Sequence, residues 1–307
     1  MIRKISYLEI DFHKYDTCIN SSAQYKYSAK SHFLDICAGK NQWEILVWGD
    51  YEAVMPIPFI KKMGYKMVIN PKLCQQLGIF SVVDQPNLNQ KFLDYFRKNY
   101  RVWFYAFNEY NHWEKPLLQR KNYIIPQEDY ANVFKKYSPK RKRKLRLDDE
   151  VKENSTIEKV GDWQLIEAFI IQNSIGADSS KDLKDFLTIY FKFLQQNQLH
   201  FYGFFYREEL INLLAIYEDP KSVVLLGTFN KKETIKLNGS SVLVDYAISQ
   251  FVQDKDFDFE GSEVPSIEEF FRGYRPVERP YPYYENLSES YFIRWGNRIK
   301  SLFKNKK

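Results

Sequence analysis

Cysteine and histidine are scarce in this 307-residue sequence, with three and four copies respectively. Cys18, Cys37 and Cys74 are scattered, without the spacing of a zinc site, and indicate reduced thiols rather than a disulfide framework. The histidines show no pairing at catalytic spacing, and the sequence contains no Ser-His-Asp order and no Walker loop. We therefore expect no bound metal and no hydrolase triad.

Long hydrophobic runs are also missing. No apolar run approaches the roughly 20 residues that a transmembrane helix needs, and the first segment, MIRKISYLEIDFHKY, lacks the apolar region of a signal peptide. These features predict a cytoplasmic protein. In contrast, 44% hydrophobic and 17% aromatic residues are enough for a substantial core, and the length fits one large or two medium domains.

Positive charge is concentrated at the C-terminal end. The net charge is +6, and residues 290–307 hold six basic residues and no acidic one. The remaining 39 basic residues equal the 39 acidic residues in number, so the body of the protein is formally neutral. This argues against a surface built throughout for nucleic acid and favours a local electrostatic role for the tail.

Residues 289–307 predict a basic amphipathic helix. Its apolar residues fall on one stripe at helical spacing: Phe292, Trp295, Ile299, Leu302 and Phe303. Such a helix suits peripheral contact with an anionic membrane. The alternative is a terminal helix that docks its stripe on the preceding domain, with the lysines in solvent.

Two helix starts and one strand end stand out in residues 238–285. Asn238 and Gly239 form a turn before a helix that Ser240 or Ser241 can cap. The free N–H groups of such a start suit a phosphate or carboxylate. Further on, a short strand over residues 257–260 ends in a glycine flanked by acidic and hydroxyl side chains, namely Glu260, Ser262 and Glu263. The alternatives are an ordinary capped helix and an ordinary tight turn.

Two ordered motifs resemble one protein family. The segments FDFEGS at 257–262 and EFFRGY at 269–274 resemble the signature of FemAB-like transferases, which belong to the GNAT acyltransferase superfamily. Upstream, MPIP at 55–58 and PKLCQQLGIF at 71–80 are similar to the pattern of the N-terminal half of that family. The resemblance covers most of the chain up to Glu285.

The resemblance implies an α+β fold with two tandem GNAT-like halves, each with a mixed central sheet. The expected boundaries are 1–130 and 131–288, with a cleft shared between the halves. The predicted order of helices, strands, helix and strand recurs in both halves, which is consistent with an internal duplication.

The resemblance also implies a donor substrate, which is either acyl-CoA or aminoacyl-tRNA. GNAT enzymes bind the pyrophosphate of the donor with a loop, and only part of that loop's sequence pattern is present here. The candidate donor-binding residues in this segment are Asn230, Asn238, Gly239, Ser240 and Ser241. Six of the seven residues at 140–146, including Arg141, are basic and could bind RNA phosphates. The alternative for this run is an ordinary solvated helix face.

Several polar residues are candidates for substrate binding. Gln75 and Gln76 suit hydrogen bonds to a peptide or sugar, or else cap their own loop. Arg272 and Tyr274, together with Arg275, suit a carboxylate or phosphate, or else form an ordinary helix end.

The expected function is transfer of an acyl or aminoacyl group to an amine of a cell-envelope precursor, sugar or peptide. If the tail binds a membrane, this acceptor is expected to be lipid-linked. Glu260 or Glu263 is the expected general base. The alternative is a catalytically degenerate GNAT fold that serves as a binding module, because the pyrophosphate loop is incomplete.

Overall fold

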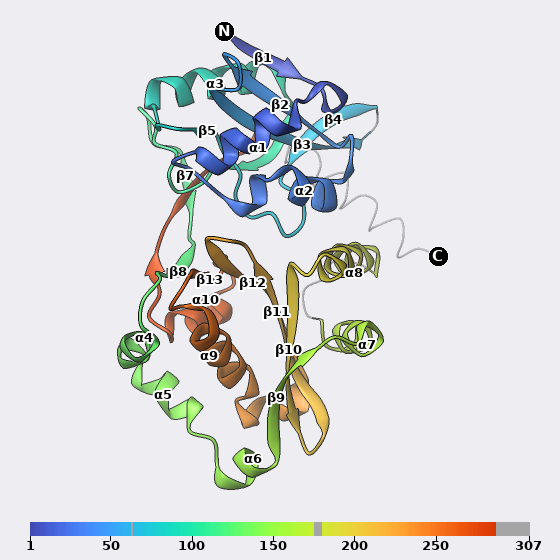
Figure 1. The fold of residues 1–307 in the computed structure, drawn as a ribbon, viewed down its shortest axis with the longest axis vertical. Coiled ribbons are helices and arrows are strands. Elements are labelled where there is room, and N and C mark those ends of the chain that lie inside the picture. Colours follow the sequence, from blue (N-terminus) through green and yellow to red (C-terminus); the bar gives the residue numbers. More distant parts are fainter. Residues whose placement is uncertain (63, 175–179, 287–307) are drawn as a thin grey trace, which may run out of the picture. The chain divides into compact units, whose positions relative to one another are not determined.

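The computed structural model describes residues 1–62, 64–174 and 180–286. The chain forms two compact units (Figure 1). One unit contains Met1–Arg120 and the described residues from Pro280 onward, and the other contains Lys121–Arg279. The chain returns to the first unit because strand β15 (Tyr281–Tyr284) pairs with β6 (Val102–Ala106) of that unit. The predicted amphipathic tail lies outside the described residues.

The first unit is built on an eight-stranded mixed sheet in the order β1-β2-β3-β4-β6-β15-β7, with β5 paired to β3. Its other strands are β1 (Ile2–Ile5), β2 (Trp43–Trp48), β3 (Ala53–Lys62), β4 (Tyr65–Ile69), β5 (Phe80–Ser81) and β7 (Leu118–Arg120). Its helices are η1 (Tyr7–Glu9), α1 (Phe12–Ser21), η2 (Tyr27–Ala29), α2 (Ser31–Leu34), η3 (Asp35–Gly39) and α3 (Pro86–Asn99). The neighbouring strands β4 and β6 run parallel.

The second unit is built on a seven-stranded mixed sheet in the order β14-β8-β13-β12-β11-β10-β9. These strands are β8 (Tyr123–Ile125), β9 (Ser155–Val160), β10 (Leu199–Tyr206), β11 (Glu209–Glu218), β12 (Ser222–Asn230), β13 (Asp256–Asp258) and β14 (Val277–Glu278). Its helices are α4 (Tyr130–Lys136), α5 (Pro139–Leu145), α6 (Asp149–Glu153), α7 (Trp163–Asn173), α8 (Ser180–Gln195), η4 (Lys232–Leu237), α9 (Gly239–Phe251) and α10 (Pro265–Arg272). The α+β prediction is confirmed.

Helices cover both faces of this second sheet. Figure 1 shows α9 on one face and α7 and α8 on the other. The central strand β11 is consequently buried on both sides from Leu210 to Tyr217. This explains its nearly continuous hydrophobic sequence, since a strand covered on one face only would alternate apolar and polar residues.

Local sequence signals set the ends of the helices that matter for the site. The hydroxyl of Ser138 accepts a hydrogen bond of 3.1 Å from the backbone N–H of Arg141, and Pro139 takes the first helical position of α5. Pro265 takes the first helical position of α10, which ends at Arg272 and is followed by Gly273 as its C-cap. Asn238 precedes α9 in the left-handed conformation, with φ of 58°.

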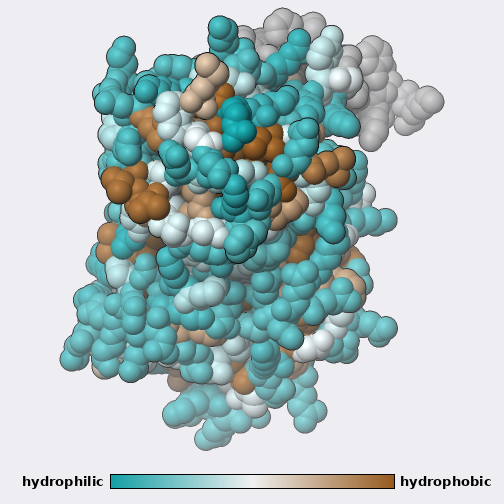
Figure 2. Space-filling model, turned by 45° about the horizontal axis from the view of Figure 1, so that its top comes forward, coloured by the Kyte–Doolittle hydropathy of each residue, from teal (hydrophilic) through white to brown (hydrophobic). Residues whose placement is uncertain are grey.

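The surface shown in Figure 2 is mainly hydrophilic, with hydrophobic residues in small groups separated by polar ones. Within residues 1–62, 64–174 and 180–286, none of the helices combines the length and the hydropathy required to cross a bilayer.

Candidate active site

Strands β12 and β13 pair in parallel over a short distance only. Their pairing covers Ser222–Val224 and Asp256–Asp258, where β13 ends. Strand β12 continues to Asn230 with β11 as its partner. In the part of the chain that the structure describes, the other edge of β12 has no strand beside it from Leu225 onward. Backbone groups on this edge are therefore not used by the sheet.

Tyr190 of α8 lies over the face of β12 next to this stretch. Its hydroxyl donates a hydrogen bond of 2.8 Å to the backbone carbonyl of Leu226, which is the extra residue of a β-bulge. A Cβ at Gly227 would lie 2.8 Å from the same hydroxyl, so glycine provides the room for it. Burial raises the pKa of Tyr190, and the nearby carboxylate of Glu260 raises it further.

Glu260 is held at the end of β13 by an unusual backbone. Glu260 and Gly261 both adopt left-handed conformations, with φ of 57° and 58°. The Glu260 N–H donates a hydrogen bond of 2.8 Å to Asp258 Oδ1. A Cβ at residue 261 would lie 2.3 Å from the carbonyl oxygen of Lys121, so only glycine fits. The half-buried Glu260 carboxylate at this turn is close enough for its charge to raise the pKa of Tyr190.

The two other predicted catalytic residues follow directly. The Ser262 hydroxyl accepts a hydrogen bond of 3.1 Å from the N–H of Val264, just before α10. Glu263 is exposed. Of the three residues, Glu260 is therefore the one whose charge acts on the buried Tyr190 beside β12.

The residues predicted to bind the donor gather where α9 begins. Asn212 of β11, which is 2% exposed, donates hydrogen bonds of 2.9 Å to Asn230 Oδ1 and 3.1 Å to Ser240 Oγ. The Ser240 hydroxyl donates a bond of 2.6 Å to Asn230 Oδ1. A Cβ at Gly239 would lie 1.9 Å from Asn212 Oδ1. The sequence analysis did not predict Asn212 as a site residue, because no recognisable motif surrounds it in β11.

Arg141 lies in the first turn of α5 and is buried, with 4% of its surface exposed. One terminal nitrogen donates to the Ser241 hydroxyl and the other donates a bond of 2.7 Å to the Phe270 carbonyl. The guanidinium carbon lies 4.2 Å from the ring centroids of Phe270 and Tyr274. Burial lowers the pKa of Arg141. This cation therefore joins α5, α9 and α10.

Tyr274 lies beside Arg141 in the buried region where α5, α9 and α10 meet. It is 1% exposed, and its hydroxyl donates a bond of 2.9 Å to the Ser241 carbonyl. Asp245 of α9, which the sequence analysis did not select, accepts bonds of 3.0 Å at both carboxylate oxygens from the Tyr130 hydroxyl. Burial raises the pKa of Asp245.

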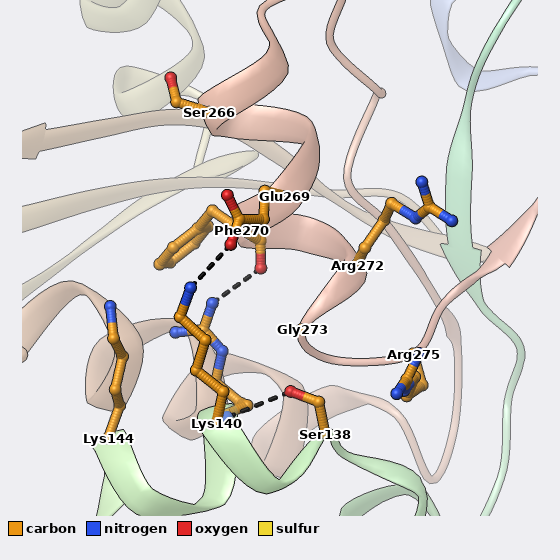
Figure 3. Close-up of a pocket in the computed structure, with 10 residues that line it drawn as sticks. Ser138, Lys140, Lys144, Ser266, Glu269, Phe270, Arg272, Gly273 and Arg275 are labelled. Carbon is orange, nitrogen blue, oxygen red and sulfur yellow. Dashed lines mark hydrogen bonds and ion pairs between the residues drawn. The ribbon is translucent and has the colours of Figure 1, made fainter.

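A cavity of about 370 Å³ opens between α5 and α10 (Figure 3). Its lining consists of Ser138, Lys140, Arg141, Lys144, Ser266, Glu269, Phe270, Arg272, Gly273 and Arg275. Figure 3 shows Lys140 and Lys144 rising from α5, with Arg272 and Arg275 on the other side. The structure thus brings Arg141 and the exposed Arg272 of the predicted substrate set to one cavity.

Gln75 and Gln76 lie in the first unit. Gln76 is fully buried; its amide nitrogen donates a bond of 2.9 Å to Gln75 Oε1, and its oxygen accepts one of 3.3 Å from the N–H of Glu109. Gly78, with φ of 135°, leaves room for the side chain of Asn111. These contacts hold the loop in place and use most of the polar capacity of Gln76. Across the described ranges, no group of three or more His, Cys, Asp or Glu residues is arranged to hold a metal ion.

Solved structures share this architecture over nearly the whole chain. The crystal structure of FemX matches with a TM-score of 0.63 at 10% identity, covering 95% of this chain and 99% of that one. The chain has the FemAB-like, tandem GNAT-type fold. A tandem GNAT protein from the clavulanic acid biosynthesis pathway matches with a TM-score of 0.50 at 7% identity, covering 92% of this chain and 97% of that one.

A third match is the DUF2156 C-terminal domain named for a lysylphosphatidylglycerol synthetase of Agrobacterium fabrum. Its TM-score is 0.51 at 10% identity, and 96% of each chain is covered. No family model and no curated protein matches the sequence. The prediction of two GNAT-like halves is confirmed.

Proposed function

We propose that this protein transfers an acyl or aminoacyl group to an amine, with the donor held by the second unit. The observation that carries the proposal is the pair of diverging strands, β12 and β13, with Glu260 at the end of the shorter one. The open edge of β12 offers backbone groups to an extended donor, and α9 begins where β12 ends. The tandem GNAT-type fold supports the same assignment.

Glu260 acts as the general base in this proposal. The acceptor amine attacks the carbonyl of a thioester or ester, so that a C–N bond forms and the C–S or C–O bond breaks. The amine proton passes to the Glu260 carboxylate, and the leaving thiolate or alkoxide takes up a proton. Much of the rate comes from holding the two substrates together, and a positioned base adds roughly 10²–10⁴-fold.

The donor is acyl-CoA or aminoacyl-tRNA. Acyl-CoA is favoured by the start of α9, where Gly239 and Ser240 bring N–H groups and the positive end of the helix dipole beside Asn230. Aminoacyl-tRNA is favoured by α5, whose sequence PKRKRKL carries five basic residues.

Side-by-side binding of acetyl-CoA and of an aminoacyl-tRNA to the full chain tests this proposal. Ser240→Ala should weaken acetyl-CoA binding, whereas Ser249→Ala, which changes a serine near the other end of α9, should not. If tRNA is the donor, binding should fall steeply with salt and with loss of α5 charges. Absence of saturable binding by either donor would remove the support for both.

A second candidate is a binding module that has lost transfer. It is favoured by the start of α9, because Asn212, Asn230 and Ser240 already hydrogen-bond one another there. Unchanged cellular function after Glu260→Gln combined with Ser262→Ala would select the module over the enzyme.

The acceptor is proposed to be an amine of a cell-envelope precursor, sugar or peptide. A lipid-linked acceptor would fit a cytoplasmic protein that contacts the inner face of an anionic membrane through residues 289–307. Sedimentation with anionic vesicles at low salt tests this: the full chain should bind, and a chain ending at Ser288 should not. Equal binding of the two would exclude the tail as an anchor.

A further inference from the structure

The cavity between α5 and α10 is strongly positive. Its lining includes five cationic side chains and a single carboxylate: Lys140, Arg141, Lys144, Arg272 and Arg275 against Glu269. Glu269 is committed to Lys140 at 2.7 Å, and both are exposed. The guanidinium of Arg272 lies 3.6 Å from the carboxylate of Glu268, a residue that does not line the cavity. The lining therefore carries a net excess of four positive charges, which an anion would balance.

Neither Lys144 nor Arg275 forms an ion pair within the described ranges. Burial lowers the pKa of Lys144, and the positive charges of Arg141 and Lys140 lower it further, which outweighs the opposite effect of Glu269. Lys144 therefore lies in the positive field of its neighbours, where a bound anion would be stabilised.

Arg141 adds an unsatisfied donor to the cavity. Its Nε–H is buried and has no hydrogen-bond acceptor, although both terminal nitrogens are bonded. A buried guanidinium N–H without an acceptor is rare and needs an explanation. A Cβ at residue 273 would lie 2.9 Å from Nε and 3.0 Å from Nη2, so any side chain there would cover this edge. Gly273 therefore adds no side chain beside this edge.

We propose that this cavity is an oxyanion site that binds a phosphate or diphosphate group, with Arg141, Lys144 and Arg275 as its donors. A phosphate offers more acceptor oxygens and more negative charge than a carboxylate, and can bind a guanidinium and an ammonium at once. The site is separate from Glu260 and the edge of β12, and it stands whether or not the protein catalyses transfer.

The test is titration of the full chain with inorganic pyrophosphate at low salt, followed by calorimetry. We expect one saturable site. Lys144→Gln and Arg275→Gln should each weaken binding by about tenfold, since each removes a charge-assisted contact. Lys142→Gln is the matched control, because it removes the same charge from α5 at a residue that does not line the cavity. No saturable binding, or equal loss in Lys142→Gln, would overturn the proposal.

A second variant tests the Nε edge of Arg141 without any change of charge. Gly273→Ala places a methyl group over Nε and should reduce pyrophosphate affinity by about tenfold if the Nε–H is a donor. Circular dichroism and a melting curve establish that the variant is folded. A folded Gly273→Ala protein that binds as tightly as the wild type would contradict the role of this edge.

Competition identifies the source of the phosphate. Displacement of pyrophosphate by CoA would assign the site to a nucleotide-bearing small molecule, and displacement by deacylated tRNA would assign it to an RNA backbone. Displacement by neither would assign it to a free phosphate ester. All three outcomes require the oxyanion site, whose existence the first titration decides.

Discussion

The side-chain amide of Asn212, within β11, donates a hydrogen bond of 3.1 Å to the hydroxyl of Ser240 in the first turn of α9. The same amide donates to Asn230 at the end of β12. One buried side chain thus joins two strands and the helix start that the donor is proposed to approach.

Asn212→Ala should therefore destabilise the protein. The substitution leaves Asn230 and Ser240 without their buried donor, which typically costs about 1–3 kcal/mol of unfolding free energy. Asn132→Ala, at an exposed position of α4, should change it by no more than about 0.5 kcal/mol. Urea denaturation measures both, and similar midpoints for the two variants would contradict the structural role of Asn212.

Arg141→Lys should be costly although it keeps the charge. A lysine ammonium cannot reach the Ser241 hydroxyl and the Phe270 carbonyl with the planar geometry of the guanidinium, nor stack between two rings. We expect a loss of about 2 kcal/mol in unfolding free energy. Arg143→Lys, two residues along the same helix at an exposed position, is the control. Equal stability of the two variants would contradict the assignment.

Local signals made much of the second unit predictable from the sequence. Helix α9, which follows Asn238, and helix α10, from Pro265 to Arg272, lie where their turn residues predict them. Each signal is a preference of a few neighbouring residues for one backbone conformation. The FDFEGS motif likewise marks the end of β13, because its glycine must adopt a positive φ.

Gly261→Ala tests that turn directly. The added Cβ would lie 2.3 Å from the Lys121 carbonyl in a left-handed residue, and backbone cannot easily move aside. We expect a loss of more than about 1 kcal/mol in unfolding free energy. At Gly161 a Cβ would meet nothing within 4 Å, so Gly161→Ala should cost far less. A Gly261→Ala protein as stable as Gly161→Ala would show that the turn is not constrained as described.

Asp245 predicts a dependence of stability on pH. Burial raises its pKa in the folded protein, so the folded state holds a proton that the unfolded state releases above the ordinary aspartate range. Stability should therefore fall as pH rises through that window. Asp245→Asn should gain stability relative to wild type as pH rises from the ordinary aspartate range to neutral pH.

The control for this prediction is Asp254→Asn, which removes the same charge from an exposed position just beyond α9. Melting temperatures at the two ends of this pH range measure the effect. A constant difference between Asp245→Asn and wild type across the pH range would contradict the account.

The contacts that complete the site could not be predicted from the sequence. Tyr190, Asn212 and Asp245 act on residues far along the chain, and no local spacing announces which strand or helix they will face. The return of β15 to the sheet of the first unit is likewise a long-range pairing. Such contacts form only once the sheet is assembled, whereas turns and helix caps depend on residues that are adjacent in the sequence.

The measurement that tests the central claim most directly is donor turnover with an amine acceptor, comparing Glu260→Gln with Glu263→Gln. The two variants remove the same charge three residues apart, one beside Tyr190 and one on the surface. With mass spectrometry of the acylated amine as readout, Glu260→Gln should lose about 10²-fold or more in rate, while Glu263→Gln keeps it within about twofold. Equal rates for the two variants would contradict Glu260 as the base, and no amine-dependent turnover by the wild type with either donor would contradict transfer itself.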